Sequence, residues 1–455
     1  METVTLEHDN DNSVKKSGKR IFIPAIGSLG DVKPYLILAK ELKKQGHIVW
    51  LGVHQRFEDE IKKYDIDTVE IGGDMEVILS TTPDGIELQR NPSIFKMGLV
   101  KRVFLPLMEE WFNGIVAGLK DADLIVLSVT SVLAGLSCIE KYSKTKAIGI
   151  YTYPCTRTAE FSPPAFGGKS ESLFNWINSF KWNIFEFGAS TMYSDKINQL
   201  RANINLPPIK LNYDQMIRSI FKRPISTATI YSKCLLAEPN DWPENEFMVG
   251  PILQEKEEDH EFQPSDDLRN FLDKWQNEKM IYVGIGSMMN IMFNADEQSQ
   301  FLKITQTAIG NTNSKAIISL VGFQNIDENK LSDRENIFYL KQTISHSWLF
   351  PYMFLAIHHG GAGTTHTSLR YGLPALILPF GADQPFNGDR VFINKLGPKP
   401  IPIRQMNVRN LTNAIQDLMN NYTMYKNNAQ KAGEMIKDEN GLGHCIQLIE
   451  KALVG

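Results

Sequence analysis

The segment Ile357–Arg390, IHHGGAGTTHTSLRYGLPALILPFGADQPFNGDR, carries the densest group of residues that could do chemistry. The glycines Gly360, Gly361 and Gly363 follow an apolar run that is typical of a strand buried in a parallel sheet. We expect them to form a tight turn, which residues with a Cβ atom could not make so closely, and a helix to begin directly after it. Its backbone N–H groups and positive dipole end would favour a bound anion such as a phosphate.

This predicted helix needs a cap, and Thr364 or Thr365 is placed to supply it. Gly372 is expected to end the helix, and Pro374 agrees with that end. His359, at the tip of the strand, adds a side-chain hydrogen-bond donor. The alternative is an ordinary turn between a strand and a helix, with the histidine in the core.

Polar groups of a different kind lie beyond the next apolar run, PALILP. Asp383 and Gln384 place a carboxylate beside an amide, and this pair suits bidentate hydrogen bonds to vicinal hydroxyls. Asp383 could also cap the helix predicted in QPFNGDRVFIN, and it could serve both purposes. A phosphate site next to groups that bind sugar hydroxyls indicates a nucleotide-sugar enzyme.

These motifs resemble the donor-binding signature of UDP-glycosyltransferases, and within them sterol 3-β-glucosyltransferases and related bacterial antibiotic glycosyltransferases. The matching runs are His-Gly-Gly-Ala-Gly-Thr, Gly-Leu-Pro, and Asp-Gln-Pro-Phe with a later Gly-Asp-Arg. The resemblance implies that Asp383 and Gln384 bind sugar hydroxyls and that the glycine turn binds the diphosphate. With a further donor at an earlier turn, the diphosphate set is Ser287, His359, Gly361, Ala362, Gly363, Thr364 and Thr365.

Asp31 is the expected general base. The run GSLGDVKP, from Gly27, resembles the Gly-Ser-Arg-Gly-Asp-Val-Gln-Pro of the sterol branch, with Leu29 and Lys33 as departures. A helix start favours the charged form of a carboxyl group and lowers its basicity, so capping alone would also explain Asp31. Burial in a closed, dry cleft would restore its proton affinity.

Two histidines are alternative bases, and two acidic pairs are possible metal ligands. His47 opens a predicted strand and His54 closes it, so His54 is the nearer rival base. Of two Asp-x-Asp spacings that could hold a metal, Asp9–Asp11 lies in a polar tail and Asp121–Asp123 precedes a strand, away from the cleft. We therefore expect no metal and no cofactor, with UDP-glucose as co-substrate.

Two further stretches resemble the sterol branch of the family in particular. YPCTRTAEFSPPAF resembles a Pro-Trp-Thr-Arg-Thr-Arg segment of the sterol branch, with Cys155 replacing its tryptophan, and SHSWLFP resembles that branch's loop beside the nucleotide base. The expected acceptor pocket comprises Ser28, Leu29, Thr156, Arg157 and Phe161. The expected base and ribose loop comprises Ile344, His346 and Trp348, where Trp348 is either a stacking platform or a core residue.

Strand and helix signals alternate in both halves of the chain. They predict an α/β protein with two Rossmann-like doubly wound domains facing across a cleft, the GT-B type. Because G-x-G-x-x-G is missing after the first strand, the first half is assigned to the acceptor. The expected boundaries are 1–19 disordered tail, 20–252 acceptor domain, 253–267 charged linker, 268–437 nucleotide-sugar domain, and 438–455 a helix that, as the resemblance implies, crosses back.

Composition limits the partners and the compartment. A net charge of −4, from 48 basic and 52 acidic residues, lacks the basic footprint of a nucleic-acid-binding protein. Four scattered cysteines without metal spacing fit a reducing compartment. The polar start lacks the apolar core of a secretory signal, and no run suits a membrane span. We expect a cytoplasmic protein that can work at a membrane surface and needs no protein partner.

With these features, the resemblance implies an inverting, metal-independent transferase that moves glucose from UDP-glucose to a hydroxyl of a sterol or similar lipophile. Aromatic residues of the first half support a lipophilic acceptor: Phe161, Phe166, Phe174, Trp176, Phe180 and Trp182. One alternative is a transferase that uses a dTDP- or UDP-sugar and a polyketide, peptide or phenolic acceptor. Another is a non-catalytic binder of nucleotide sugar or lipid.

Overall fold

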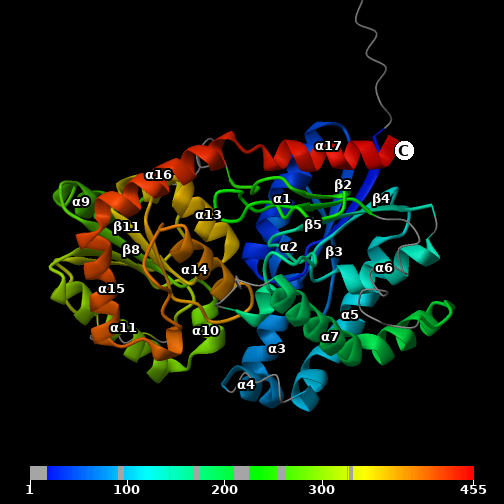
Figure 1. The fold of residues 1–455 in the computed structure, drawn as a ribbon, viewed down its shortest axis with the longest axis horizontal. Coiled ribbons are helices and arrows are strands. Elements are labelled where there is room, and N and C mark those ends of the chain that lie inside the picture. The colour runs from blue at the N-terminus through cyan, green and yellow to red at the C-terminus, as the bar shows by residue number, and fades with distance from the viewer. Residues whose placement is uncertain are drawn as a thin grey trace, which may run out of the picture.

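The computed structural model describes residues 18–90, 97–142, 144–167, 175–209, 225–254, 263–324, 326 and 331–454. Two parallel sheets, one of seven strands and one of five, form its centre (Figure 1). The first sheet has the order β3-β2-β1-β4-β5-β6-β7 and the second β10-β9-β8-β11-β12. Two parallel α/β sheets confirm the predicted fold class.

The strands of both sheets are short and mostly apolar. Those of the first sheet are β1 (Arg20–Pro24), β2 (Ile48–Val53), β3 (Asp67–Glu70), β4 (Leu124–Leu127), β5 (Lys146–Tyr151), β6 (Thr227–Thr229) and β7 (Glu246–Met248). Those of the second are β8 (Met280–Gly284), β9 (Lys315–Ser319), β10 (Ile337–Leu340), β11 (Leu355–His358) and β12 (Ala375–Ile377).

The central strands carry apolar side chains on both faces because a core covers each face. In β1, Ile21 and Ile23 belong to one buried cluster, and Phe22 between them belongs to another. In β8, Tyr282 and Val283 are divided between two clusters in the same way. This alternation is what two-sided burial of a parallel sheet requires.

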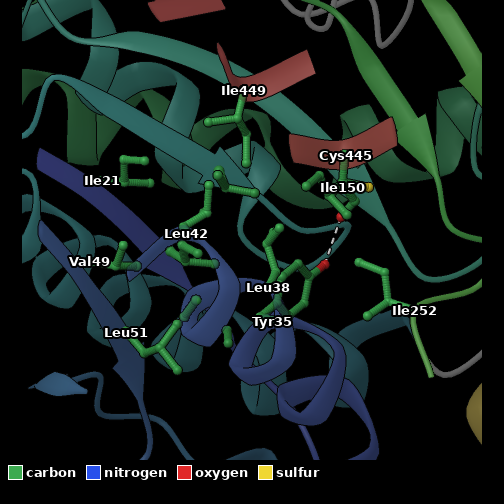
Figure 2. Packing of buried hydrophobic residues seen from close by; sticks show 14 of the residues in the cluster. Ile21, Tyr35, Leu38, Leu42, Val49, Leu51, Ile150, Ile252, Cys445 and Ile449 are labelled. Carbon is green, nitrogen blue, oxygen red and sulfur yellow. Dashed lines mark hydrogen bonds between the residues drawn. The ribbon is translucent and has the colours of Figure 1, made fainter. Parts of the chain in front are cut away.

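The helices of the predicted acceptor half are α1 (Leu29–Lys44), α2 (Glu58–Lys62), α3 (Met75–Thr81), α4 (Pro83–Arg90), α5 (Met97–Gly118), α6 (Val132–Lys141) and α7 (Asn175–Asn203), with 3-10 turns η1 (Gln55–Phe57) and η2 (Pro164–Phe166). In α1, the side chains of Tyr35, Leu38 and Leu42 are buried against the sheet (Figure 2). The Tyr35 hydroxyl also donates to the Ile150 carbonyl at 2.6 Å, which fixes α1 on β5.

The helices of the predicted donor half are α9 (Asp266–Lys274), α10 (Met288–Met292), α11 (Ala295–Asn311), α12 (His346–Leu349), α13 (Ala362–Arg370), α14 (Gln384–Ile393), α15 (Val408–Asn420) and α16 (Tyr422–Asp438), with 3-10 turns η5 (Phe350–Tyr352) and η6 (Ile403–Gln405). The last helix, α17 (Gly441–Val454), lies on the first sheet instead (Figure 1). Its Cys445 and Ile449 join the core that contains α1 (Figure 2).

Several predictions fall partly outside the described residues. The tail up to residue 17, residues 255–262 of the predicted linker, the first Asp-x-Asp spacing and Phe174 lie there. The exact domain boundaries therefore stay predictions. Within the part of the chain that the structure describes, no helix combines the length and the hydropathy that crossing a bilayer requires.

Candidate active site

The candidate donor site lies beyond the two central strands of the second sheet. β8 and β11 are neighbours, with Gly284 paired to His358, and the strand order reverses between them. Ligands of such sheets bind at this switch point, outside the carboxyl ends of the strands. The turns after the two strands are in contact there, since a Cβ on Gly286 would lie 3.8 Å from His359 Cε1. Ser287, at the first of these turns, is exposed.

The helix after β11 begins earlier than predicted. α13 starts at Ala362, with Gly361 as its N-cap, so the prediction that Thr364 or Thr365 caps it was wrong. The chain enters the helix directly because Gly360 adopts a φ of 90°, which residues with a side chain rarely do. The end was predicted correctly, since Gly372 follows the helix with a φ of 64°. A glycine cap leaves the N–H groups of the first turn without an intrahelical partner.

The members of the predicted diphosphate set differ in accessibility. Thr365 is fully buried, and its N–H and hydroxyl both donate to the Gly361 carbonyl at 3.0 Å. Its donors are therefore used within the helix. Gly361, Ala362, Gly363 and Thr364 are exposed or half-buried, so their backbone faces the site.

His359 is held against the same turn. A Cβ on Gly361 would lie 2.6 Å from His359 Nε2, so only glycine leaves room for the ring. The Nδ1 atom is buried and has no hydrogen-bond partner among the described residues. Burial lowers the pKa of His359 to about 4, against the opposing effect of the Gly284 carbonyl. His359 is therefore neutral at pH 7 and offers a ligand a hydrogen bond but no charge.

The carboxylate of Asp383 points to the start of α13. Asp383 is the N-cap residue of α14, yet within the described structure its side chain makes no capping hydrogen bond there. Instead Oδ2 accepts a hydrogen bond from Asn387 Nδ2 at 2.8 Å, and the N–H of Ala362 stabilises its charged form. One N–H of the predicted anion site thus already faces a carboxylate of the protein.

Gln384 is more restricted than predicted. It is buried, and its Oε1 accepts a hydrogen bond from the Phe380 N–H at 2.8 Å. Only the Nε2 group is left for a ligand. A sugar would therefore meet a carboxylate acceptor in Asp383 and an N–H donor in Gln384.

Asp31 lies at the third position of α1 and not at the cap. Ser28 is the N-cap, and its N–H and hydroxyl both donate to Asp31 Oδ2 at 2.8 Å. A Cβ on Gly27 would lie 2.5 Å from the same oxygen, so glycine is needed for this geometry. Burial raises the pKa of Asp31 and outweighs the two hydrogen bonds from Ser28, which act in the opposite direction. The Oδ1 atom accepts no hydrogen bond from the residues that the structure describes.

The two halves bring the two aspartates together. The pKa of Asp383 is raised to about 7, first by burial and second by the negative charge of Asp31. Burial, then the charge of Cys155 and those of Asp383 and Asp31, raise the pKa of Tyr153 in the loop after β5, so Tyr153 lies near both carboxylates. A carboxylate of the first half therefore lies near the proposed donor site.

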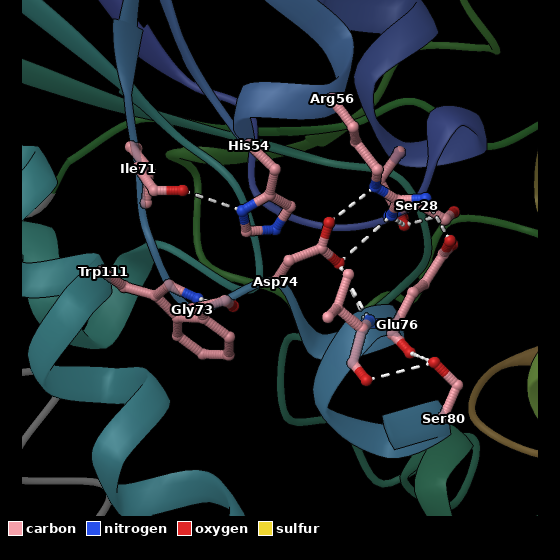
Figure 3. A network of polar contacts seen from close by, with 11 residues as sticks. Ser28, His54, Arg56, Ile71, Gly73, Asp74, Glu76, Ser80 and Trp111 are labelled. Atoms are coloured by element: carbon pink, nitrogen blue, oxygen red, sulfur yellow. Dashed lines mark hydrogen bonds and ion pairs between the residues drawn. The ribbon is translucent and has the colours of Figure 1, made fainter. Parts of the chain in front are cut away.

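The rival histidines are engaged elsewhere. His47 Nε2 lies 2.6 Å from Glu450 Oε1 of α17, at the opposite end of β2. His54 is 2% exposed, and its Nδ1 pairs with the Ile71 carbonyl at 2.9 Å (Figure 3). Beside it, Arg56 forms ion pairs with Asp74, the N-cap residue of α3, and with Glu76 in its first turn (Figure 3). His54 Nε2 has no hydrogen-bond partner among the described residues, but it is buried, so a ligand could reach it only if the surrounding structure moved.

Three residues predicted to line the acceptor pocket are used inside the protein. Thr156 donates to Glu246 at 3.0 Å, and Arg157 binds Glu186 and Asn183 of α7. Phe161 is 1% exposed and packs against Phe386 of the donor half at 5.7 Å. Ser28 and Leu29, in contrast, are half-buried beside Asp31.

The aromatic residues of α7 lie on two sides of that helix. Trp182 is 1% exposed and donates to the Phe161 carbonyl. Trp176 and Phe180 are exposed by 67% and 55%. The aromatic content of this region thus divides between core and surface.

Part of the loop predicted to bind the nucleotide base and ribose lies in the hydrophobic core. Ile344 is buried, so only its backbone could meet a nucleotide. His346 stacks on Phe350 at 4.6 Å and pairs with the Tyr282 hydroxyl at 2.9 Å. Burial, and then the charge of Lys33 from α1, lowers the pKa of His346 to about 3. Trp348 is half-buried at 5.1 Å from Tyr352, which leaves part of its ring accessible.

Sequence reasoning did not single out Tyr153, Asn387 or Lys33 as site residues. Asn387 had a usable signal, because it follows Asp383 by one helical turn and must share its face. Tyr153 begins the segment noted for the acceptor and carried no signal of its own. Lys33 was noted only as a departure from the sterol branch.

Comparisons with known proteins found two matching domain families and several related sequences. Residues 21–117 match the glycosyltransferase family 28 N-terminal domain, and residues 325–441 match the erythromycin biosynthesis protein CIII-like C-terminal domain. A sterol 3-beta-glucosyltransferase of Arabidopsis thaliana is 26% identical over 99% of this chain and 71% of its own length. One from Yarrowia lipolytica is 28% identical over 97% of the chain, which spans only 29% of that relative. The match to a second sterol 3-beta-glucosyltransferase of Arabidopsis thaliana covers 66% of that relative's length.

Solved structures share the fold. The calicheamicin glycosyltransferase CalG4 superposes with a TM-score of 0.65 at 17% identity, over 96% of this chain and 98% of its own. The spinosyn rhamnosyltransferase SpnG gives a TM-score of 0.61 at 14% identity, over 95% of this chain and 100% of its own. The two parallel sheets thus have the GT-B arrangement of these enzymes. The two matched domains and the sequence relatives show that the chain is a distant homologue of glycosyltransferases of the family 28/UDP-glycosyltransferase type.

Proposed function

We propose that the protein is an inverting, metal-independent glycosyltransferase that moves glucose from UDP-glucose to a hydroxyl of a sterol or a similar lipophile. The observation that carries the proposal is the open start of α13 beside Asp383, with Asp31 of the other half near enough for its charge to raise the pKa of Asp383. A base from one half thereby faces groups suited to a diphosphate and a sugar in the other.

The residues suggest a single displacement. The acceptor oxygen attacks the anomeric carbon while its proton passes to Asp31 Oδ1. The bond from that carbon to the diphosphate oxygen breaks, and its electron pair leaves with UDP. Backbone N–H groups of Gly363 and Thr364, with the Ser287 hydroxyl and His359, stabilise the charge that develops there. Attack from the side opposite the leaving group inverts the anomeric carbon.

Asp383 and Gln384 hold the sugar in this scheme, and the loop of His346 and Trp348 holds the nucleotide. Ser28 and Leu29 border the acceptor next to the base. The sterol acceptor is supported by relatives that are themselves named sterol 3-beta-glucosyltransferases. With such an acceptor the enzyme would work in the cytoplasm at the face of a membrane, without a protein partner.

A second candidate is transfer from a dTDP-sugar to a small aglycone. It is favoured by structural relatives that were solved with dTDP, with thymidine diphosphate and with a spinosyn aglycone. Both candidates use the same fold, so the donor and acceptor distinguish them.

One incubation tests both. The native protein is mixed with UDP-glucose or dTDP-glucose and a pool of sterols and phenols, and the products are read by mass. We expect a sterol heavier by one hexose with UDP-glucose only, and thermal stabilisation by UDP. Stabilisation by dTDP alone would select the second candidate, and binding without hydrolysis or transfer would indicate a non-catalytic binder.

A further inference from the structure

Two adjacent residues of the acceptor half contact both helices whose starts form the proposed donor site. Tyr231 and Ser232 follow β6 and are fully buried. The Tyr231 hydroxyl donates to Asn387 Oδ1 in α14 at 2.9 Å. The Ser232 N–H donates to His366 Nε2 in α13 at 3.1 Å. The end of β6 is therefore joined by polar contacts to the two elements that carry the proposed diphosphate and sugar groups.

The bonding fixes the orientation of the Asn387 amide. The Gly360 carbonyl can only accept, so the Nδ2 group must face it, at 2.8 Å. The second hydrogen of the same group points to Asp383 Oδ2, also at 2.8 Å. The Oδ1 atom is left to accept from Tyr231. This fully buried amide therefore uses all its polar atoms, and each one holds a part of the site.

His366 is fixed in the same way. Because Nε2 accepts from the Ser232 N–H, the proton of the neutral ring must sit on Nδ1, which lies 2.7 Å from the Ala362 carbonyl. Burial lowers the pKa of His366 to about 4, so the neutral ring that this bonding needs is present at pH 7. The Tyr231 ring also meets this ring edge to face at 4.7 Å.

From this geometry we propose that Tyr231 is a positioning residue for sugar recognition. Its hydroxyl holds the Asn387 amide, and that amide holds the Asp383 carboxylate over the start of α13. The inference rests on the proposed function, in which Asp383 binds the donor sugar. Its consequence is that a residue of the acceptor half sets how well the donor half recognises the sugar, separately from the diphosphate.

The first test is Tyr231→Phe, which removes the hydroxyl and keeps the ring packing. Binding of UDP and of UDP-glucose is measured by calorimetry on the full chain. We expect the UDP affinity to stay within about twofold and the UDP-glucose affinity to fall roughly tenfold, since Asn387 Oδ1 is left buried without a donor. The matched control is Tyr425→Phe, whose partly buried hydroxyl donates to Asp417 at 2.9 Å in another part of the donor half. It should change neither affinity.

A mutant cycle separates positioning from packing. In an Asn387→Leu background, Tyr231→Phe should cause no further change in the ratio of UDP-glucose to UDP affinity, because its effect passes through Asn387. A second readout needs no Asn387 variant. The Asn387 bond favours the ionised form of Asp383, so loosening it in Tyr231→Phe should move the pH midpoint of UDP-glucose binding upward.

The possible outcomes distinguish a failure of the proposed function from a failure of the positioning role of Tyr231. If the native protein binds neither UDP nor UDP-glucose, the proposed function and the positioning role both fall. If the native protein binds both, and Tyr231→Phe weakens both equally or leaves the pH midpoint in place, the proposed function stands and the role of Tyr231 is overturned. An additive effect in the Asn387→Leu background would overturn it as well.

Discussion

The turn after β1 and the turn after β11 have similar backbone conformations, but their helix starts carry different groups. Each leads through a glycine of positive φ, Gly27 or Gly360, into a helix at the carboxyl end of a central strand. The helix start after β1 is occupied by a capping box, in which Ser28 and Asp31 satisfy each other. The helix start after β11 has the glycine cap Gly361.

The difference shows what decides whether a helix start binds a ligand. Unpaired N–H groups and the helix dipole attract negative charge in both places. At α1 the protein supplies that charge itself, as the Asp31 carboxylate, so the turn offers a base. At α13 the cap supplies none, and only Asp383 approaches from the side, so the turn offers room for a diphosphate. The variants below test this contrast from the largest expected effect to the smallest.

Asp31→Asn should have the largest effect. An asparagine can still accept hydrogen bonds from Ser28, but it cannot take a proton from the acceptor. We expect kcat to fall about 10²- to 10⁴-fold, which is the usual contribution of a general base. UDP affinity, measured by calorimetry, should stay unchanged because the turn after β11 is untouched. Turnover near the native value would show that α1 supplies no base.

Gly361→Ala should damage the other turn. The added Cβ would lie 2.6 Å from His359 Nε2, so the ring must move out of the site. We expect UDP to bind roughly tenfold more weakly, equal to about 1.4 kcal/mol. Gly310→Ala is the matched control, since an added Cβ there meets nothing within 4 Å. Unchanged UDP affinity in Gly361→Ala would argue against the anion site.

Because Asp383 is buried near the charge of Asp31, its ionisation should make the stability of the protein depend on pH. The pKa of Asp383 is raised to about 7 in the folded protein, so between about pH 4 and pH 7 the folded state holds a proton that the unfolded state has lost. This group therefore lowers stability as pH rises through that window. Asp383→Asn should raise the melting temperature at pH 8 and have little effect near pH 4.

A second variant sharpens that prediction. Because the charge of Asp31 is the second cause of the raised pKa, Asp31→Asn should shift the midpoint of the Asp383 effect to lower pH. Melting curves of the native protein, the two single variants and the double variant would show it. An unchanged midpoint would mean that the two carboxylates do not face each other.

The elements that place both turns were predictable from the chain. Short apolar runs indicate buried strands, and the glycines between strand and helix indicate turns. These local signals were enough to predict two doubly wound sheets. The helix end at Gly372 was predictable for the same reason. The cap was not, because a glycine cap has no side chain to recognise and Thr364 resembles a cap residue more closely.

Tertiary contacts explain the other differences. Thr156, Arg157 and Phe161 belong to a segment that resembles the family. In the structure, however, Thr156 bonds Glu246 and Phe161 packs against Phe386, and both partners are distant in the sequence. The meeting of Asp31 with Asp383 and the link from Tyr231 to Asn387 join the two halves of the chain. A pattern within one segment carries no information on such pairs, since it reports only local periodicity and local chemistry.

His54→Gln should have the smallest effect and completes the contrast with Asp31. His54 lies at the carboxyl end of β2, where a base could reach an acceptor, but it is 2% exposed and its Nδ1 bonds the Ile71 carbonyl. A glutamine amide can donate the same hydrogen bond, so we expect a stability loss of about 1 kcal/mol and a kcat close to native. Thermal melting and steady-state rates measure the two quantities. A loss of kcat as large as that of Asp31→Asn, with the fold intact, would transfer the role of base from the start of α1 to the end of β2.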